Sequence, residues 1–230
     1  MGIIINNLVT NNLVMHANPI YLVGSSVASN NSGSGNITVT QSTAIRAGDL
    51  LVTVGSGNAS GGNQLWSAST GASGTTWTEA ADQGTAPNLY VAYKTAVAAD
   101  AGFVQTYNWV LSQSVAVHTL IFRYAQWDAI GSIATGTGTG SLTVPAVTTT
   151  ADNAHIILFF AGTDMTLQSV PVPPFNTVSG PTTTGGTPVG SNTVLTRLQA
   201  TAGSSGTATV TPLNGTGARA AVQLAVKPAI

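Results

Sequence analysis

Cysteine is absent from this chain of 230 residues, and charged side chains are scarce. Without cysteine the protein has neither a disulfide framework nor thiol chemistry. Lysine, arginine, aspartate and glutamate make up 6% of the residues, against about 25% in an ordinary domain. The surface must therefore be built mainly from serine, threonine, asparagine, glutamine, glycine and backbone groups.

The few charges are balanced and scattered. Six basic residues face seven acidic ones, the formal net charge is −1, and no basic cluster occurs. Because contacts to phosphates need lysine or arginine, this pattern argues against nucleic acid as a partner. No segment approaches the roughly 18 consecutive apolar residues of a membrane-spanning helix, so no membrane association is predicted.

Clusters of reactive side chains are also missing. The three histidines, His16, His118 and His155, have no acidic residue next to them and no partner at metal-ligand spacing, which argues against zinc and favours structural roles. The aspartates occur singly at expected turns and strand ends, where carboxylates cap backbone groups. Glu79 has no marked carboxylate partner for glycoside hydrolysis, and no serine lies in a nucleophile elbow. We therefore expect no catalytic residues, no cofactor and no metal.

The pattern that is present is that of β-strands. Residues 88–126 are rich in aromatic side chains and predict three consecutive strands, at 88–97, 103–111 and 115–124. In the second of these, large apolar residues fall on alternate positions, which is typical of a strand with one buried face. Residues 112–114 are the expected hairpin link between the second and third strands.

Further short strands are expected along the chain, and no helical pattern stands out. They are predicted at 20–23, 36–40, 50–54, 74–79, 141–144, 147–150, 155–160, 194–200, 207–211 and 220–226. Many short strands separated by turn signals predict an all-β fold, an antiparallel β-sandwich that is jelly-roll-like. Residues 127–130 are expected to open a connection, and long loops are predicted at 55–71, 131–140 and 168–192, outside the sandwich.

One domain over residues 19–230 is expected, because sandwiches of this length are often undivided. The alternation of apolar residues also predicts which side chains form its core. They are Leu51, Val91, Tyr93, Tyr107, Trp109, Leu120, Phe122, Ile157, Phe159 and Leu224.

Residues 1–18 stand apart as an extended N-terminal arm. The segment Asn6-Asn7-Leu8-Val9 recurs as Asn11-Asn12-Leu13-Val14, a spacing that suits neither a helix nor a strand. One interpretation is a flexible chain end. The other is an assembly arm that docks on a partner, because aliphatic residues are atypical of disordered tails. The residues that would make its contacts are Ile3, Ile4, Ile5, Leu8, Val9, Leu13 and Val14.

Tryptophans are the candidates for contact with a sugar, because an exposed aromatic ring stacks well on a saccharide. Trp66 lies in a polar segment predicted to be a loop, where glycan contact and core packing are equally supported. For Trp77 and Trp127 we expect core packing.

Several short motifs together resemble a known family. They are Gly48-Asp49-Leu50-Leu51, residues 74–79, residues 89–94, Tyr107-Asn108-Trp109, Phe122-Arg123-Tyr124, residues 144–152 and residues 222–228. Over roughly residues 19–228 this pattern is similar to a β-sandwich (jelly-roll-like) domain family of bacteriophage virion structural proteins, which includes capsid decoration and fibre proteins.

The resemblance implies a β-sandwich located in the virion, with other virion proteins of the capsid or tail as partners. No coiled-coil stalk accompanies the domain, which favours a capsid decoration, cement or head-fibre protein that acts through assembly contacts. The alternative is a receptor- or glycan-binding module of a tail fibre or spike. The low charge, with a mean hydropathy of +0.27, also predicts a homo-oligomer, for which a trimer is favoured, or a place in a larger shell.

Overall fold

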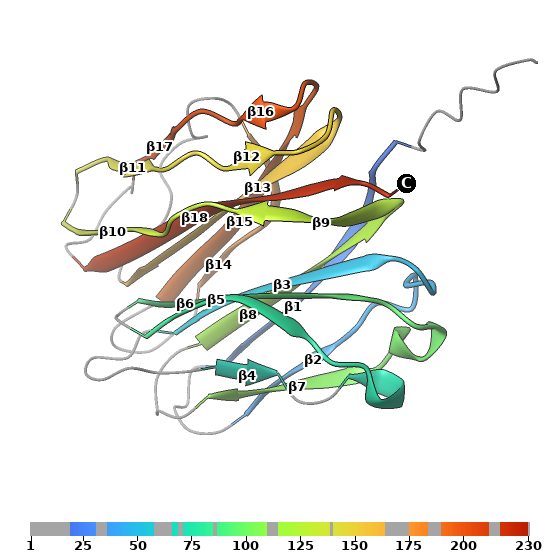
Figure 1. Ribbon diagram of the computed structural model, residues 1–230. Helices are drawn as coiled ribbons and strands as arrows, with labels where there is room; N and C mark the ends of the chain where they lie inside the picture. The colour runs from blue at the N-terminus through green and yellow to red at the C-terminus, as the bar shows by residue number, and fades with distance from the viewer. Residues whose placement is uncertain are drawn as a thin grey trace, which may run out of the picture.

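The structure, a computed structural model, describes residues 19–30, 36–57, 66–68, 71–84, 87–109, 115–138, 140–163, 175–183, 190–211 and 217–229. Within these ranges the regular structure consists of β-strands and two three-residue 3-10 helices, η1 and η2. All strand pairs that it contains are antiparallel. The predicted all-β, antiparallel sandwich is confirmed (Figure 1).

The first half of the chain forms one large and one small sheet. Its elements are β1 (Tyr21–Asn30), β2 (Ile37–Thr40), β3 (Leu50–Gly57), β4 (Trp66–Ala68), η1 (Ala72–Gly74), β5 (Thr78–Gln83), β6 (Asn88–Thr95), η2 (Ala98–Asp100), β7 (Val104–Trp109) and β8 (Val115–Arg123). The five-stranded sheet has the order β1-β8-β3-β6-β5, and the three-stranded sheet has the order β2-β7-β4.

The second half forms a six-stranded sheet and two short two-stranded sheets. Its elements are β9 (Ala125–Ile130), β10 (Ala134–Thr137), β11 (Leu142–Val144), β12 (Thr148–Thr149), β13 (Ala154–Thr163), β14 (Asn176–Thr183), β15 (Gly190–Gln199), β16 (Gly203–Ser204), β17 (Ala208–Val210) and β18 (Ala218–Pro228). The large sheet has the order β10-β18-β13-β15-β14, with β9 also paired to β18, while β11 pairs with β17 and β12 with β16.

The large sheets of the two halves have the same strand order, with β9 and β10 together in the place of β1, so the chain contains an internal structural repeat. Pairing is nested in the first half, where β1 joins β8, β2 joins β7 and β3 joins β6. In the second half β10 joins β18, β11 joins β17 and β13 joins β15 in the same nested way. The jelly-roll-like part of the predicted fold stays a prediction. This repeat was not predicted from the sequence.

Details of register repeat as well. Ile37 of β2 pairs with Tyr107 of β7, and Leu142 of β11 pairs with Val210 of β17 in the equivalent place. The edge strands β5 and β14 each carry a register shift after their second residue, between Glu79 and Ala81 and between Thr177 and Ser179. Because β-bulges are positional features rather than accidents of packing, their recurrence supports the repeat independently of the strand order.

The repeat produces four layers of β-structure, which Figure 1 shows stacked from β2, β4 and β7 at the bottom to β11, β12, β16 and β17 at the top. The large sheets of the two halves face each other across the central hydrophobic core. A second core lies between the six-stranded sheet and the outer strands β11 and β17. Two further clusters cover the outer face of the five-stranded sheet. Both large sheets are therefore buried on both faces.

Strand β13 shows how the sequence fits this position. Ile157 and Phe159 point into the central core, whereas Ile156, Leu158 and Phe160 point into the outer core. A strand covered on both faces needs apolar residues at every position, so its sequence is a continuous apolar run without alternation. The prediction of a core strand at 155–160 is confirmed.

The predicted core residues are largely buried but do not form one core. Leu51, Val91, Tyr107, Leu120, Phe122, Ile157, Phe159 and Leu224 are fully buried. Tyr93 is half-buried at the edge of the central core, and the side chain of Trp109 lies outside the described residues. Leu51 and Tyr107 belong to clusters on the outer face of the five-stranded sheet, so the expectation of a single core is wrong.

Several predicted loops and links also need correction. The expected hairpin across residues 112–114 is wrong, because β7 pairs with β2 and β4 while β8 pairs with β1 and β3. Parts of the predicted loops are strand: residues 55–57 extend β3, residues 134–137 form β10, and residues 176–183 form β14. Residues 127–130 belong to β9, and residues 74–77 lie before β5 rather than in a strand. These segments form strands because their backbones pair with neighbouring strands. Glycine-rich sequences give little indication of such pairing.

Candidate functional site

Almost all the basic side chains are used inside the molecule. Lys94, Arg123 and Lys227 form ion pairs. Arg197 donates to the Ser205 carbonyl, and Arg219 donates to the Gly138 and Gly140 carbonyls. The sixth basic residue, Arg46, is exposed. The surface in the described part of the chain is therefore even poorer in available positive charge than the composition indicates.

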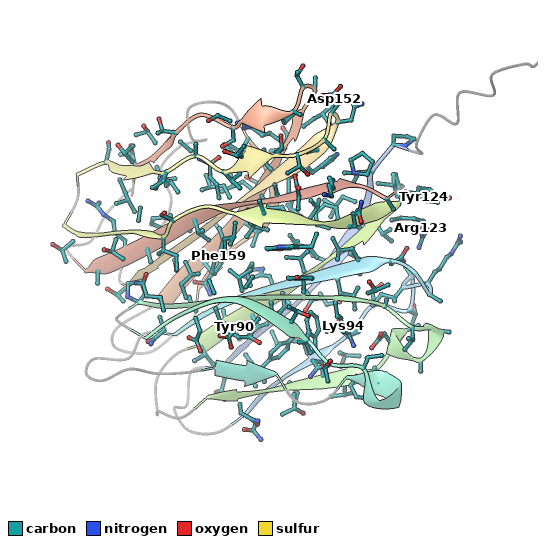
Figure 2. All side chains as sticks on the ribbon, in the orientation of Figure 1. Tyr90, Lys94, Arg123, Tyr124, Asp152 and Phe159 are labelled. Carbon is teal, nitrogen blue, oxygen red and sulfur yellow. The ribbon has the colours of Figure 1, made fainter. Side chains whose placement is uncertain are left out.

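Lys94 and Asp100 form a buried ion pair, and Figure 2 shows Lys94 between the five-stranded sheet and the three-stranded sheet below it. The Lys94 Nζ lies 2.6 Å from Asp100 Oδ1, and the two side chains are only 3% and 1% exposed. Lys94 Nζ also donates to Thr75 Oγ1 at 3.1 Å and lies 5.1 Å from the centre of the Trp77 ring. The second Asp100 oxygen accepts the Val97 backbone N–H at 2.9 Å. This pair fixes η2 against β6 and leaves Lys94 no freedom to bind a ligand.

A second ion pair holds the end of β8. Arg123 donates from Nε and Nη2 to the two oxygens of Asp49, each at 2.9 Å, and Asp49 Oδ2 also accepts the Arg46 N–H. The hydrogen bond that Arg123 donates to Asp49 raises the pKa of Arg123 above its ordinary value. Tyr124 follows with a φ of 59° and a side chain 48% exposed. Figure 2 shows Arg123 and Tyr124 at the end of the molecule that carries the C-terminus.

Four of the six aspartates cap backbone groups, as expected, whereas Asp82 lies within β5 and Asp164 lies outside the described residues. Asp128 accepts the Thr150 N–H at 2.8 Å, and Asp152 accepts the Ala202 N–H at 2.7 Å. Asp49 and Asp100 do the same in addition to their ion pairs. Within the described residues, no group of three or more His, Asp or Glu side chains is placed to hold a metal ion.

The two described histidines are packed into the sheets. His118 is fully buried in β8, and burial lowers its pKa from 6.5 to about 4. His155 of β13 is partly buried, with its ring edge-on to Phe122, and burial lowers its pKa as well. Both positions fit the predicted structural role, whereas His16 lies outside the described residues.

Acidification should destabilise the fold through His118. The folded protein keeps this imidazole neutral down to about pH 4, while the unfolded chain takes up the proton near pH 6.5. The free energy of unfolding should therefore fall, by on the order of 3 kcal/mol, as the pH drops from 6.5 to 4, because protons bind preferentially to the unfolded state.

Chemical denaturation across this pH range measures the effect, and a His118→Gln variant should lose most of the slope. A His155→Gln variant serves as the control and should keep most of it, since His155 is less buried. Equal slopes in the wild type and His118→Gln would contradict the assignment.

An open hollow of about 590 Å³ lies where the two halves of the molecule meet. Its walls come from the segment before β5, from the end of β6 and from the start of β9. Two aromatic residues, Tyr93 of β6 and Trp127 of β9, line it together. Their rings are stacked with centroids 4.3 Å apart and an interplanar angle of 2°. The stack joins the first half of the chain to the second.

Apart from Leu50, Gly74 and Lys94, whose ammonium group is bound to Asp100, the remaining lining of this hollow is polar and uncharged. It includes the side chains of Thr75, Thr76, Thr78, Thr95 and Gln126. Thr76, Thr78 and Thr95 are exposed. Gln126 donates to the Pro228 carbonyl at 3.2 Å, which fixes its amide at the rim.

The site residues predicted from sequence are not brought together by the described structure. The arm residues Ile3, Ile4, Ile5, Leu8, Val9, Leu13 and Val14 lie outside the described residues. The Trp66 backbone lies in β4 and pairs with Trp109, so its predicted loop position is wrong, and its side chain is outside the described set.

The other two tryptophans both contact hydrophobic clusters and are partly buried, as expected of core packing. Trp77 donates from Nε1 to Gln105 Oε1 at 3.0 Å and lies on the outer side of the sheet. Trp127 also lines the hollow. Sequence reasoning missed this second role and missed Tyr93 as its partner, because nothing in the linear pattern places β6 against β9.

Comparisons with known proteins give no relative. No family model matches the chain, and no curated protein or solved structure matches it. No helix in the described ranges is both long and apolar enough to cross a membrane.

Proposed function

We propose that this protein is a bacteriophage virion structural protein, a capsid decoration, cement or head-fibre protein that acts through assembly contacts. The observation that carries the proposal is the internal use of charge, by which five of the six basic side chains are bound to groups of the same chain. A surface with so little free charge resists association weakly. It suits a protein that is held among many copies of its neighbours.

The edge strand β1 supports the same role. It ends the five-stranded sheet in the described part of the chain. Sheet edges are usually protected by charged residues or proline, but Tyr21–Asn30 contains neither. Tyr21 is 61% exposed and Val27 is 49% exposed on this strand. An uncharged edge with exposed apolar side chains is suited to strand addition by a neighbouring chain.

Residues 1–18 directly precede this edge in the sequence, and we assign them the role of an assembly arm. Their seven aliphatic side chains, from Ile3 to Val14, would each gain roughly 1.5–3 kcal/mol on full burial. The arm contains one ionisable side chain, His16, so apolar contact rather than ion pairing would hold it in place. The assembly is proposed to be homo-oligomeric, with a trimer favoured, and to include other virion proteins of the capsid or tail.

Deleting residues 1–18 should abolish attachment without unfolding the protein. The described strands begin at Tyr21 and the cores contain residues from Ile20 onward, so thermal stability should be nearly unchanged. Attachment is measured by co-sedimentation with phage particles that lack the protein, and self-association by sedimentation velocity at micromolar concentration.

The full chain should assemble and attach, and a Thr143→Lys variant, altered at an exposed position on β11, serves as the control for nonspecific surface effects. A truncated chain that attaches as well as the full chain, or a full chain that stays monomeric and never binds particles, would contradict the proposal. The alternative function, a receptor- or glycan-binding module of a tail fibre or spike, predicts instead a low copy number on the particle and glycan binding that a Trp66→Ala variant loses.

A further inference from the structure

The hollow between the two halves has an aromatic wall that the fold itself does not require. The internal repeat supplies the comparison, because the strand pairs of the five-stranded sheet have equivalents in the six-stranded sheet. Trp127 of β9 pairs with Val226 of β18, immediately before the register shift in that ladder. In the first half Leu22 of β1 pairs with Phe122 of β8, also immediately before a register shift. Leu22 therefore occupies the position equivalent to Trp127.

The position of the other ring, Tyr93, also has an equivalent in the second half, and that position is not aromatic either. Tyr93 of β6 pairs with Val52 of β3. The matching strand pair in the second half places Thr196 of β15 opposite Ile157 of β13. The repeat thus fills the two equivalent positions with leucine and threonine. A large stacked ring pair is not needed to close the sandwich at this point, which indicates a role beyond packing.

The hollow also has the size and lining of a small-ligand site. Its volume of about 590 Å³ falls within the roughly 300–1,000 Å³ range of ligand pockets. The Tyr93–Trp127 stack forms part of the lining, and the exposed residues Thr78, which pairs with Tyr93, Thr95, which shares a face of β6 with Tyr93, and Thr76 lie in the lining beside it. Hydroxyl groups both donate and accept hydrogen bonds, so they match a ligand that is itself rich in hydroxyls.

The charge of the hollow limits the ligand further. Lys94 is the charged residue among those lining it, and its ammonium group is bound to Asp100 and Thr75. No free cation is therefore presented to a phosphate, sulfate or carboxylate by the lining residues. The aromatic stack, the threonine hydroxyls and the lack of a free charge together favour a ligand that has apolar C–H faces, carries several hydroxyls and is uncharged.

We propose that this hollow binds a neutral saccharide, with one sugar face against the Tyr93–Trp127 stack and its hydroxyls hydrogen-bonded by the threonines and Gln126. The site is distinct from Trp66 and does not depend on the assembly role. Loss of saccharide binding and loss of particle attachment are therefore separately measurable.

The test is a titration of the full chain with a panel of neutral tetrasaccharides, namely maltotetraose, cellotetraose, chitotetraose and β-1,4-galactotetraose. Saturation-transfer NMR and tryptophan fluorescence report binding up to millimolar concentrations. Sialyllactose is the anionic comparison. At least one neutral oligosaccharide should bind and perturb tryptophan emission, while sialyllactose should gain nothing from its carboxylate.

Two variants locate the site. Trp127→Leu installs the residue that the repeat already uses at the equivalent position, so the fold should tolerate it, and it should weaken binding about tenfold. Thr76→Arg leaves the aromatic pair intact and fills the hollow from an exposed position, and it should abolish binding. Thr143→Arg, at an exposed position on β11 in the outer layer, is the matched control and should bind like the wild type.

The binding results either support or overturn the proposed saccharide site. Binding that is lost in Thr76→Arg and weakened in Trp127→Leu, but kept in Thr143→Arg, supports the proposal. Binding to none of the neutral probes, tighter binding of sialyllactose than of every neutral probe, or equal binding by wild type and Thr76→Arg would overturn it.

Discussion

Replacing Phe160 by alanine is expected to destabilise the protein by about 3–5 kcal/mol, as much as the same change at Phe159. The two residues are neighbours on β13 and point to opposite faces of its sheet. Phe159 lies in the central core between the large sheets, whereas Phe160 lies in the outer core, which the strand pair β11–β17 helps to form. Both side chains have no exposed area. In a two-layer sandwich one of them would face solvent and tolerate replacement.

Denaturant unfolding of the single variants measures both losses. Leu198→Ala on the neighbouring strand β15 is the control, because Leu198 is 57% exposed and its loss should cost about 0.5 kcal/mol or less. A cost of less than about 1 kcal/mol for Phe160→Ala would show that the outer two-stranded sheets do not cover the six-stranded sheet, and the four-layer arrangement would be wrong.

The fold class and most strand positions could be predicted because alternation and apolar runs are local properties of the sequence. The number of layers could not. The apolar run of β13 predicts a strand buried on both faces, but it does not say what covers each face. In β3, Leu51 and Val52 are both fully buried on opposite faces, and a single-core model has no place for one of them.

The layer arrangement had a sequence signal that single-strand reasoning does not use. Ile37-Thr38-Val39 recurs as Leu142-Thr143-Val144, and each segment opens the outer layer of its half. Repeats are the first feature to look for in a chain, because each unit then covers the face that its copy leaves open. With the repeat recognised, two facing large sheets and two outer covers follow directly.

The candidate site was less predictable than the fold. Tyr93 and Trp127 were each expected in the core, and each does contact it. Their stacking depends on how the first half docks on the second, a relation between distant strands that no local pattern encodes. The pairing of Lys94 with Asp100 joins two residues that are close in the chain, so a local pattern could have indicated it. Their burial, however, depends on η1, η2 and Trp77, which cover them.

The second large effect is expected at this buried ion pair. Asp100→Asn keeps an oxygen for the Val97 N–H but removes the charge that balances Lys94, so the ammonium group is left inside the protein with Thr75 and the Trp77 ring. With a Lys94 side chain 3% exposed, the stranded charge should cost about 3–5 kcal/mol. Lys227→Met is the control, because its pair with Asp128 is longer, 3.4 Å, Lys227 is 27% exposed, and the buried Asp128 carboxylate keeps its hydrogen bonds from the Thr150 N–H and hydroxyl. That change should cost about 1 kcal/mol or less.

The origin of the loss can be separated from the loss itself by a double-mutant cycle. If the cost arises from an unbalanced buried charge, adding Lys94→Met to Asp100→Asn should restore a large part of the stability, since both charges are then gone. Urea unfolding of the wild type, the two single variants and the double variant measures the coupling. A double variant that loses the sum of the two single losses would show that Lys94 and Asp100 stabilise the protein through their separate contacts, with Thr75 and with the Val97 N–H, and that their attraction contributes little.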